Sequence, residues 1–395
     1  MLRLARDAGA STVAWTIDYD ALALGRQRAL QSALEEAGLR AVAVHDAPAV
    51  HPDETAAARS ADCGRGYRAF APYVTAWSHA PRAPVADVPR FASLPLVSEP
   101  LPTAHELGTT APSQAASESH ARGALAAYLA APVLQYSAAR NVPAGEPTAR
   151  LSAALAFGTL AARTVLAELD VRARDPFLLA EEHVALRAFA RALAQRDFFL
   201  QLAWFFEDAP DAPLQPRMRR FPFARNHPAL DAWHDGRTGY PFVDAGLRQL
   251  RATGWMHPRA RLVAASFLCF DLGVDWRVGR DAWEALLEED DAALATGNWQ
   301  WVAGVGADLA QFPRIYNPRK QARAFDPRGA YVRRWIPELR HRPDADLFGG
   351  AQAPERQLSL ELFDGATYPP PVVEHEAAAR AFLRRYGDFM REVRR

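Results

Sequence analysis

Helical spacing of apolar residues is the feature that most limits the fold of this chain, and it dominates from about Glu118 onward. Apolar side chains recur there at intervals of three and four, so each segment can bury one face as an amphipathic helix. The segments with this spacing are residues 120–134, 150–167, 178–206, 244–253, 258–272 and 280–287. The spacing predicts a large all-helical domain, and the chain as a whole is predicted to be mainly α.

The first part of the chain has a different pattern, in which short apolar runs flank one helix. Residues 12–15 and 39–44 are typical of strands, and the helix predicted between them covers about 20–37 and stops at Gly38. Two parallel strands are too few for an independent sheet, so we expect only a partial α/β, Rossmann-like domain. The expected organisation is this partial domain at 1–80, a connector rich in proline, serine and threonine at 81–117, and the helical domain at 118–395.

Composition and charge narrow the classes of protein further. Basic and acidic residues number 46 each, so the formal charge of zero gives no general support for nucleic-acid binding, although a local basic face stays open. The sequence has no run of 18 apolar residues and no signal-type start, so we expect a cytoplasmic protein without a membrane segment. Cys63 and Cys269 are too few for a disulfide framework, and we expect both to be small buried hydrophobes.

A polar segment at 148–152 follows a turn at 143–147. We expect this segment to open a helix, with Thr148 at its N-terminus. A helix N-terminus presents free backbone N–H groups, and hydroxyls with Arg150 add donors suited to a diphosphate. Taken alone, the segment also fits an ordinary threonine cap beside a solvent-facing arginine.

A second group of polar residues lies at 238–257. Gly239 and Pro241 favour a turn, and Asp244 is placed to cap the helix that follows. His257 ends the group, and its residue type fits either a hydrogen-bonded structural histidine or a general base.

An acidic run at 288–291 leads into the aromatic segment 296–301. Such a run usually forms a solvated face. Arg261 upstream offers a second interpretation, because its guanidinium paired with Glu289 or Asp291 would line the polar edge of a ring-shaped ligand.

Taken in order, these segments resemble the FAD domain of the photolyase/cryptochrome family. Segment 148–152 is similar to the family's T-S-R-L-S phosphate segment, with Ala149 in place of its serine. Residues 238–259 contain T-G-Y-P-F-V-D-A-G-L-R-Q-L and then T-G-W-M-H-P-R, the longest similar run. Further similar segments are G-N-W-Q-W at 297–301, R-I-Y-N-P at 314–318 and W-I-P-E-L at 335–339. The likeness runs from about residue 10 to near Arg385 and implies an FAD-binding flavoprotein.

The resemblance implies FAD as the cofactor and assigns residues to it and to DNA. The residues implied to hold FAD are Tyr136, Thr148, Ala149, Arg150, Leu151, Ser152, Arg196, Arg261, Glu289, Asp290 and Asp291. Those implied to contact DNA are Gln195, Arg259 and Trp301.

Electron transfer to the flavin is also implied, but by an altered chain of aromatic residues. Trp299 and Trp276 match the inner and middle members of the family's tryptophan triad, whereas Phe223 stands at its outer position. Phenylalanine is much harder to oxidise than tryptophan. Either Trp233 or Tyr240 replaces it, or photoreduction by this route is poor.

The chain departs from the family's pattern near the chemistry. Ala192 and Gln195 stand where repairing members often carry a glutamate and a tryptophan that contact the lesion, and Pro258 stands where many have asparagine. Ala295 replaces an asparagine that faces the flavin. Family members also carry about half a domain before the point where Met1 falls, so we expect FAD alone and no second antenna chromophore.

Two functions follow from the resemblance. The first is a DNA photolyase, in which blue light drives an electron from reduced FAD to a flipped-out pyrimidine dimer. For this function we expect single-stranded lesion DNA to be favoured and the protein to work as a monomer. The alternative is a cryptochrome-like flavoprotein that senses light or redox state with little or no repair. A degenerate member that folds without FAD is a third hypothesis, which Arg261, Asp291 and the polar segment disfavour.

Overall fold

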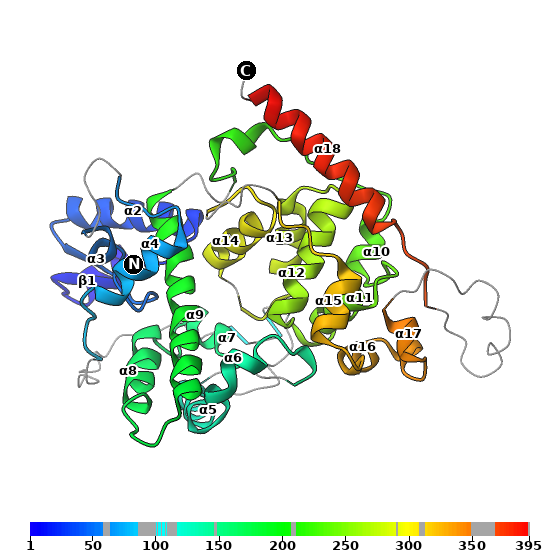
Figure 1. Ribbon diagram of the computed structural model, residues 1–395. Coiled ribbons are helices and arrows are strands. Elements are labelled where there is room, and N and C mark those ends of the chain that lie inside the picture. The colour runs from blue at the N-terminus through cyan, green and yellow to red at the C-terminus, as the bar shows by residue number, and fades with distance from the viewer. Residues whose placement is uncertain are drawn as a thin grey trace. The chain divides into compact units, whose positions relative to one another are not determined.

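The structure is a computed structural model, and it describes residues 1–57, 64–85, 100, 102–103, 105–106, 108, 117–145, 148–206, 211–289, 291–307, 313–348 and 368–393. In these residues one pair of parallel strands forms the only sheet, and the other named elements are helices (Figure 1). The prediction of a mainly α protein is confirmed. Most of the predicted connector, together with Cys63, lies outside the described residues. No helix in the described part of the chain is long and apolar enough to cross a membrane.

The chain divides into two compact units. The first unit is Met1–Tyr67, Ala71–Leu134 and Ala149–Glu207, and the second is Arg68–Phe70, Gln135–Thr148 and Asp208–Arg395. The polar segment 148–152 therefore begins in the second unit and continues in the first. The domain borders expected at residues 80 and 117 stay predictions.

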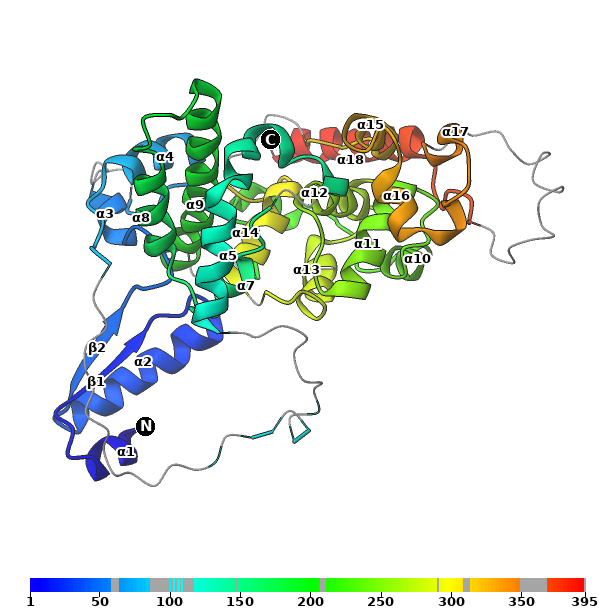
Figure 2. The same cartoon turned by 90° about the horizontal axis from the view of Figure 1, so that it is seen from below.

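The sheet of the first unit is a single β-α-β crossover (Figure 2). Strands β1 (Thr12–Thr16) and β2 (Arg40–Val44) pair in parallel, and helix α2 (Ala21–Glu36) connects them. The side chain of Asp20 caps α2 by accepting a hydrogen bond of 2.8 Å from the backbone of the third residue of the helix. Gly38 follows α2 with a φ of 73°, which a glycine adopts without a steric penalty. The predicted strand, helix and strand are confirmed.

Helices make up the rest of the first unit. They are α1 (Leu2–Asp7), α3 (Pro52–Ala57), α4 (Phe70–His79), α5 (Glu118–Ala130), α7 (Ser152–Ala156), α8 (Ala162–Arg172) and α9 (Ala180–Phe205). The single helix predicted at 150–167 is wrong, because the structure has α7 and α8 separated by a turn. Gly158 in that turn has a φ of 72°, outside the range of a right-handed helix.

The second unit contains helices α6 (Tyr136–Ala139), α10 (Leu230–His234), α11 (Pro241–Thr253), α12 (Pro258–Ser266), α13 (Trp276–Glu284), α14 (Ala292–Val302), α15 (Pro318–Phe325), α16 (Ala330–Trp335), α17 (Asp344–Leu347) and α18 (His375–Val393). Short 3-10 turns at Pro143–Gly145, Pro216–Arg220 and Pro337–Leu339 lie between some of these helices, and the turn at Pro132–Gln135 leads from the first unit into α6. A π-helical turn at Phe267–Asp271 extends α12, so the helix predicted at 258–272 is confirmed with a wider final turn.

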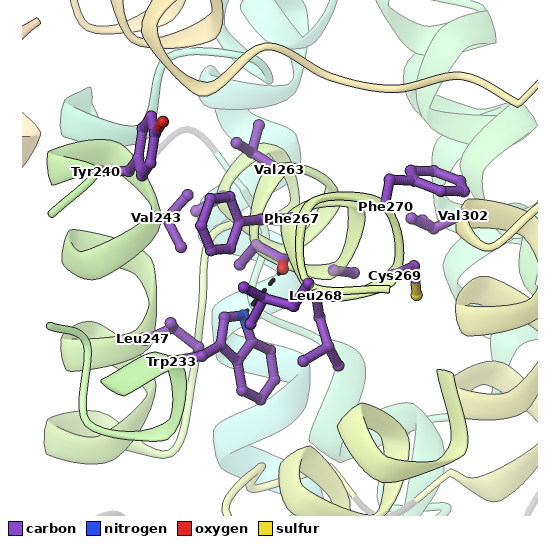
Figure 3. Packing of buried hydrophobic residues seen from close by; sticks show 14 of the residues in the cluster. Trp233, Tyr240, Val243, Leu247, Val263, Phe267, Leu268, Cys269, Phe270 and Val302 are labelled. Atoms are coloured by element: carbon purple, nitrogen blue, oxygen red, sulfur yellow. Dashed lines mark hydrogen bonds between the residues drawn. The ribbon is translucent and has the colours of Figure 1, made fainter. Parts of the chain in front are cut away.

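The core of the second unit is an apolar cluster centred on α11, α12 and the π-helical turn (Figure 3). Trp233, Tyr240, Phe267 and Phe270 are all almost completely buried in it. Cys269 is also buried and is a free thiol, as expected. Gly279 on α13 packs closely against this core, because a Cβ built there would lie 2.2 Å from the ring of Trp299.

We predict that Gly279→Ala destabilises the protein by about 1–3 kcal/mol, because the added methyl forces Trp299 or its neighbours to move. The control is Gly387→Ala on α18, where a Cβ would meet its nearest atom at an ordinary 3.7 Å. That variant should gain about 0.5–1 kcal/mol from the better helix former. Urea unfolding of both variants measures the two changes, and equal effects would contradict the close-packing argument.

Candidate functional site

The polar segment 148–152 is not the start of a helix, contrary to the prediction. Helix α7 begins at Ser152, and Leu151 precedes it with no side-chain cap. The reason is Arg150, whose φ of 48° lies in the left-handed region. It is the only non-glycine residue with positive φ in the described part of the chain. Such backbone strain is typical of functional sites.

The donor set of this segment nevertheless suits a phosphate-bearing cofactor. The hydroxyl oxygen of Thr148 is buried and has no hydrogen-bond partner among the described residues. Ser152 supplies a second hydroxyl, Arg150 a guanidinium, and buried Leu151 anchors the backbone between them. An unpaired buried hydroxyl costs free energy unless a ligand or water pairs with it, so these residues fit the diphosphate of FAD.

Arg196 and Asp197 form a buried charged pair on α9. Arg196 donates to the carbonyl oxygens of Ala47 at 2.6 Å and Leu155 at 3.1 Å. The carboxylate of Asp197 accepts from the indole nitrogen of Trp77 at 2.8 Å. It also accepts from the backbone amides of residues 49 and 50 at 2.9 and 3.1 Å. In the first unit, therefore, Arg196 holds the loop at Ala47 and helix α7 to α9, and its contact with FAD stays a prediction.

Tyr136 begins α6 in the second unit. Burial raises the pKa of its phenol above the usual value. The guanidinium carbon of Arg140 lies 5.6 Å from the centre of its ring, within the range of a cation–π contact. The ring of Tyr136 is therefore a largely apolar face, with the guanidinium of Arg140 beside it.

Arg261 pairs with Glu289, one of the two partners expected for it. The guanidinium donates to Glu289 at 2.5 Å and to the backbone carbonyl of Met256 at 2.8 Å. Asp291 instead caps α14, accepting from the backbone amide of Leu294 at 3.1 Å. Asp290 lies outside the described residues. A partly buried arginine with its acidic partner fits the polar edge of a flavin ring.

Asp244 does not cap α11, which is a second correction. Its buried carboxylate accepts from the backbone amide and hydroxyl of Thr238 at 2.8 and 2.6 Å, and from the amide of Gly239 at 3.1 Å. The hydroxyl of Tyr368 donates to it as well. Asp244 therefore ties the turn before α11 to a distant segment of the chain. Composition favoured a cap because the helix was expected to begin three residues later than it does.

His257 is a structural histidine, which was one of the two interpretations of this residue. It is completely buried, and its Nδ1 accepts from the backbone amide of Arg259 at 3.1 Å, which caps α12. Gln249 accepts a hydrogen bond of 3.1 Å from the backbone amide of His257. No base function is needed to explain these contacts.

Arg259, one of the residues expected to contact DNA, is held by two neighbours that the sequence pattern did not indicate. Its Nη2 donates to Asn141 at 2.6 Å, and its guanidinium carbon lies 4.2 Å from the centre of the Phe325 ring. Trp301 is half-buried, with the guanidinium of Arg314 at 5.3 Å from its ring. Gln195 is exposed on α9.

Trp276 and Trp299 are both buried in the second unit, and their part in electron transfer stays a prediction. The ring of Trp299 contacts Trp283, which the predictions missed, at a centroid distance of 4.6 Å. The signal was present in the sequence, because Trp283 follows Trp276 by seven residues and so lies on the same face of α13. Phe223 packs against other aromatic rings, including Phe221 at 4.7 Å.

Known families match both parts of the chain. The family model for the FAD binding domain of DNA photolyase matches residues 189–388, and the model for DNA photolyase matches residues 1–91. The chain belongs to the DNA photolyase/cryptochrome family. As in this family, a domain for FAD follows an N-terminal photolyase domain.

Individual photolyases and cryptochromes are similar over most of their length. The chain is 35% identical to the deoxyribodipyrimidine photo-lyase of Halobacterium salinarum, across 98% of this chain and 81% of that protein. A crystal structure of a class III photolyase from Agrobacterium tumefaciens matches with a TM-score of 0.85 at 29% identity, covering 99% of this chain and 82% of that one. The cryptochrome of Synechocystis sp. PCC6803 matches with a TM-score of 0.85 at 25% identity, covering 98% and 80%.

We predict that Asp197 makes stability depend on pH. Burial raises the pKa of its carboxyl from 3.8 to about 6, so the folded protein binds this proton more tightly than the unfolded chain does. The resulting stability is present below about pH 4 and is lost as the pH rises through about 6, a change of roughly 3 kcal/mol. Asp197→Asn removes the titrating group, so its stability relative to the parent should rise over this range.

Urea unfolding at several pH values measures this difference. Asp170→Asn is the control, because Asp170 is an exposed carboxylate of the same unit, paired with Arg82 at 3.0 Å. Its difference from the parent should change little with pH. A constant or falling difference for Asp197→Asn would show that the three donated hydrogen bonds outweigh burial.

Proposed function

We propose that this protein is an FAD-dependent photolyase that uses blue light to split pyrimidine dimers in DNA. The observation that carries the proposal is the 35% identity to a deoxyribodipyrimidine photo-lyase across 98% of the chain. The unpaired hydroxyl of Thr148 and the strained backbone at Arg150 support a cofactor with phosphate groups at this segment.

We assign the predicted FAD residues to two tasks. Thr148, Arg150 and Ser152 would hold the diphosphate, with Ala149 and Leu151 supplying the backbone between them. Tyr136, Arg261, Glu289, Asp290 and Asp291 would surround other parts of the cofactor, and Arg196 would support the segment by holding α7 to α9. Bound FAD supplies the electron that opens the dimer after light absorption. These residues bind and orient the cofactor, and no acid or metal on the chain is required.

DNA contact is assigned to Arg259, Trp301 and Gln195. Arg259 would bind phosphate, because Asn141 and Phe325 already fix its guanidinium. Trp301 offers an aromatic surface to a flipped base, but Gln195 cannot stack as a tryptophan would. A lesion in single-stranded DNA needs no unpairing, so the lost stacking contact favours it over duplex.

A cryptochrome-like sensor is the alternative function. The similarity to the Synechocystis cryptochrome supports it, as does the replacement of lesion contacts at Ala192, Gln195 and Pro258. A sensor would bind FAD equally well and respond to light without splitting dimers. Repair by the reduced protein separates the two functions.

We predict that Arg150→Ala loses most of its FAD during purification. A charged contact to a phosphate is worth about 1.5–3 kcal/mol, so affinity should fall by roughly tenfold or more. Arg150→Lys keeps the charge without the bidentate geometry and should retain an intermediate amount. Arg187→Ala, which removes an exposed cation on α9, controls for loss of charge alone. The ratio of flavin to protein absorbance measures each variant, and full retention by Arg150→Ala would refute the phosphate assignment.

We also predict slow repair of duplex DNA by the parent and faster repair by Gln195→Trp. Stacking of a base on an aromatic ring is worth about 1–3 kcal/mol, which the parent lacks at this position. The assay follows dimer loss under blue light with chemically reduced FAD, on single-stranded and duplex substrates. The gain should be larger on duplex, where the flipped base must be held against re-pairing. Gln195→Leu, which adds no aromatic surface, is the control.

Fast duplex repair by the parent would contradict the argument from the lost stacking contact. Absence of repair on both substrates, in a protein that holds FAD, would favour the sensor instead.

A further inference from the structure

Three tryptophans of the second unit form a continuous group of rings. Trp299 of α14 lies 4.6 Å from Trp283 of α13, measured between ring centroids. Trp283 in turn stacks on Trp233 of α10 at 6.0 Å with an interplanar angle of only 8°. Trp233 also meets Trp299 edge-on at 6.4 Å. Such near-parallel and edge-on rings at these distances are in direct contact, which is what short-range electron transfer requires.

The route through Trp276 is less favourable in this chain. Trp276 makes no ring contact with another aromatic side chain in the described residues. Its ring instead faces the guanidinium groups of Arg277 at 5.4 Å and Arg280 at 5.3 Å. Both cations are paired with carboxylates, Asp275 and Asp281, so their field is reduced but not removed. Cations beside a ring oppose its oxidation to a radical cation. Beyond it, Phe223 is a poor electron donor.

We infer that electrons reach the flavin through Trp299, Trp283 and Trp233, and that this branch replaces the route through Trp276 and Phe223. The inference rests on the proposed FAD-dependent function. Trp299 gives one electron to the photoexcited flavin and becomes a radical cation. Trp283 then reduces Trp299, and Trp233 reduces Trp283, so one electron has moved and the oxidised site is Trp233.

The surroundings of Trp233 determine the form of the final radical. Its indole N–H donates to the backbone carbonyl of Ala264 at 3.1 Å, drawn as a dashed line in Figure 3, and its side chain is completely buried. A peptide carbonyl accepts a hydrogen bond but is too weak a base to take the proton. The radical therefore stays protonated, and its hydrogen bond to the carbonyl stabilises the positive charge. A thiolate in solution returns one electron and becomes a thiyl radical, so no proton is exchanged on the indole.

Three matched substitutions test this branch in the FAD-bound protein. Trp233→Phe should slow photoreduction in the presence of a thiol by about tenfold or more, equivalent to about 1.4 kcal/mol in the barrier. Trp283→Phe should slow it less, because Trp233 also contacts Trp299 directly at 6.4 Å. Trp276→Phe is the control, since Trp276 is equally buried, and it should stay within about twofold of the parent. Transient absorption should show a protonated tryptophan radical in the parent and in Trp276→Phe, with a much shorter lifetime in Trp233→Phe.

Phe223→Trp keeps the inference testable if a buried substitution loses FAD. The added tryptophan completes the route through Trp276. Because the branch through Trp233 already operates, the photoreduction rate of this variant should stay within about twofold of the parent. In FAD-free protein, near-ultraviolet circular dichroism should show coupling of the stacked Trp233 and Trp283 rings. That signal should be lost in Trp233→Phe and kept in Trp276→Phe.

The inference is overturned if Trp276→Phe slows photoreduction as much as Trp233→Phe, or if Phe223→Trp raises the rate more than about tenfold. Failure of the proposed function is seen separately, as a parent protein without bound FAD or without repair by chemically reduced FAD. Neither of those results depends on the route that electrons take through the tryptophans.

Discussion

The packing of Trp299 directly on Gly279 is the contact on which the second unit's site depends. A Cβ at this glycine would come within 2.2 Å of the Trp299 ring, so the ring of Trp299 on α14 packs directly on the backbone of α13. Trp283, one turn further along α13, is thereby placed against Trp299. The loop between the same two helices carries Glu289 to its ion pair with Arg261. One small residue thus fixes the aromatic group and the polar edge together, because dense packing leaves neither free to shift alone.

Buried charge has the corresponding role in the first unit. Asp197 gathers two backbone amides and an indole N–H from segments about 120 to 148 residues away in sequence. Its neighbour Arg196 donates to carbonyls of the same loop and of α7. These hydrogen bonds satisfy backbone groups that have no partner within a helix or sheet. Their donors and acceptors are two adjacent residues of α9, Arg196 and Asp197. The hydrogen bond from Arg196 to Leu155 therefore holds the segment after Arg150 against α9. This contact does not depend on a cofactor.

The spacing of apolar residues predicted α2, α9 and the two strands well, because these elements depend on local sequence. Gly38, which ends α2, was also visible in the sequence. Local spacing could not reveal the turn between α7 and α8, where Gly158 ends a pattern that still reads as one helix. It also misplaced Asp244, whose partners include Tyr368, 124 residues away. The flavin assignment came from residue types in order along the chain. The ring group around Trp283 needed the fold, because Trp233 and Trp299 come from other helices.

The surroundings of Arg259 favour a DNA-binding function over one that involves the cofactor alone. Burial lowers the pKa of its guanidinium, and its Nε is buried with no partner among the described residues. Asn141 and Phe325 orient the group but neither neutralises its charge. A partly buried cation without a carboxylate is costly, and a phosphate would offset that cost. The flavin residues would be equally useful to a sensor, whereas an arginine fixed in this way would gain stability from a bound anion, as the proposed contact with a DNA phosphate supplies.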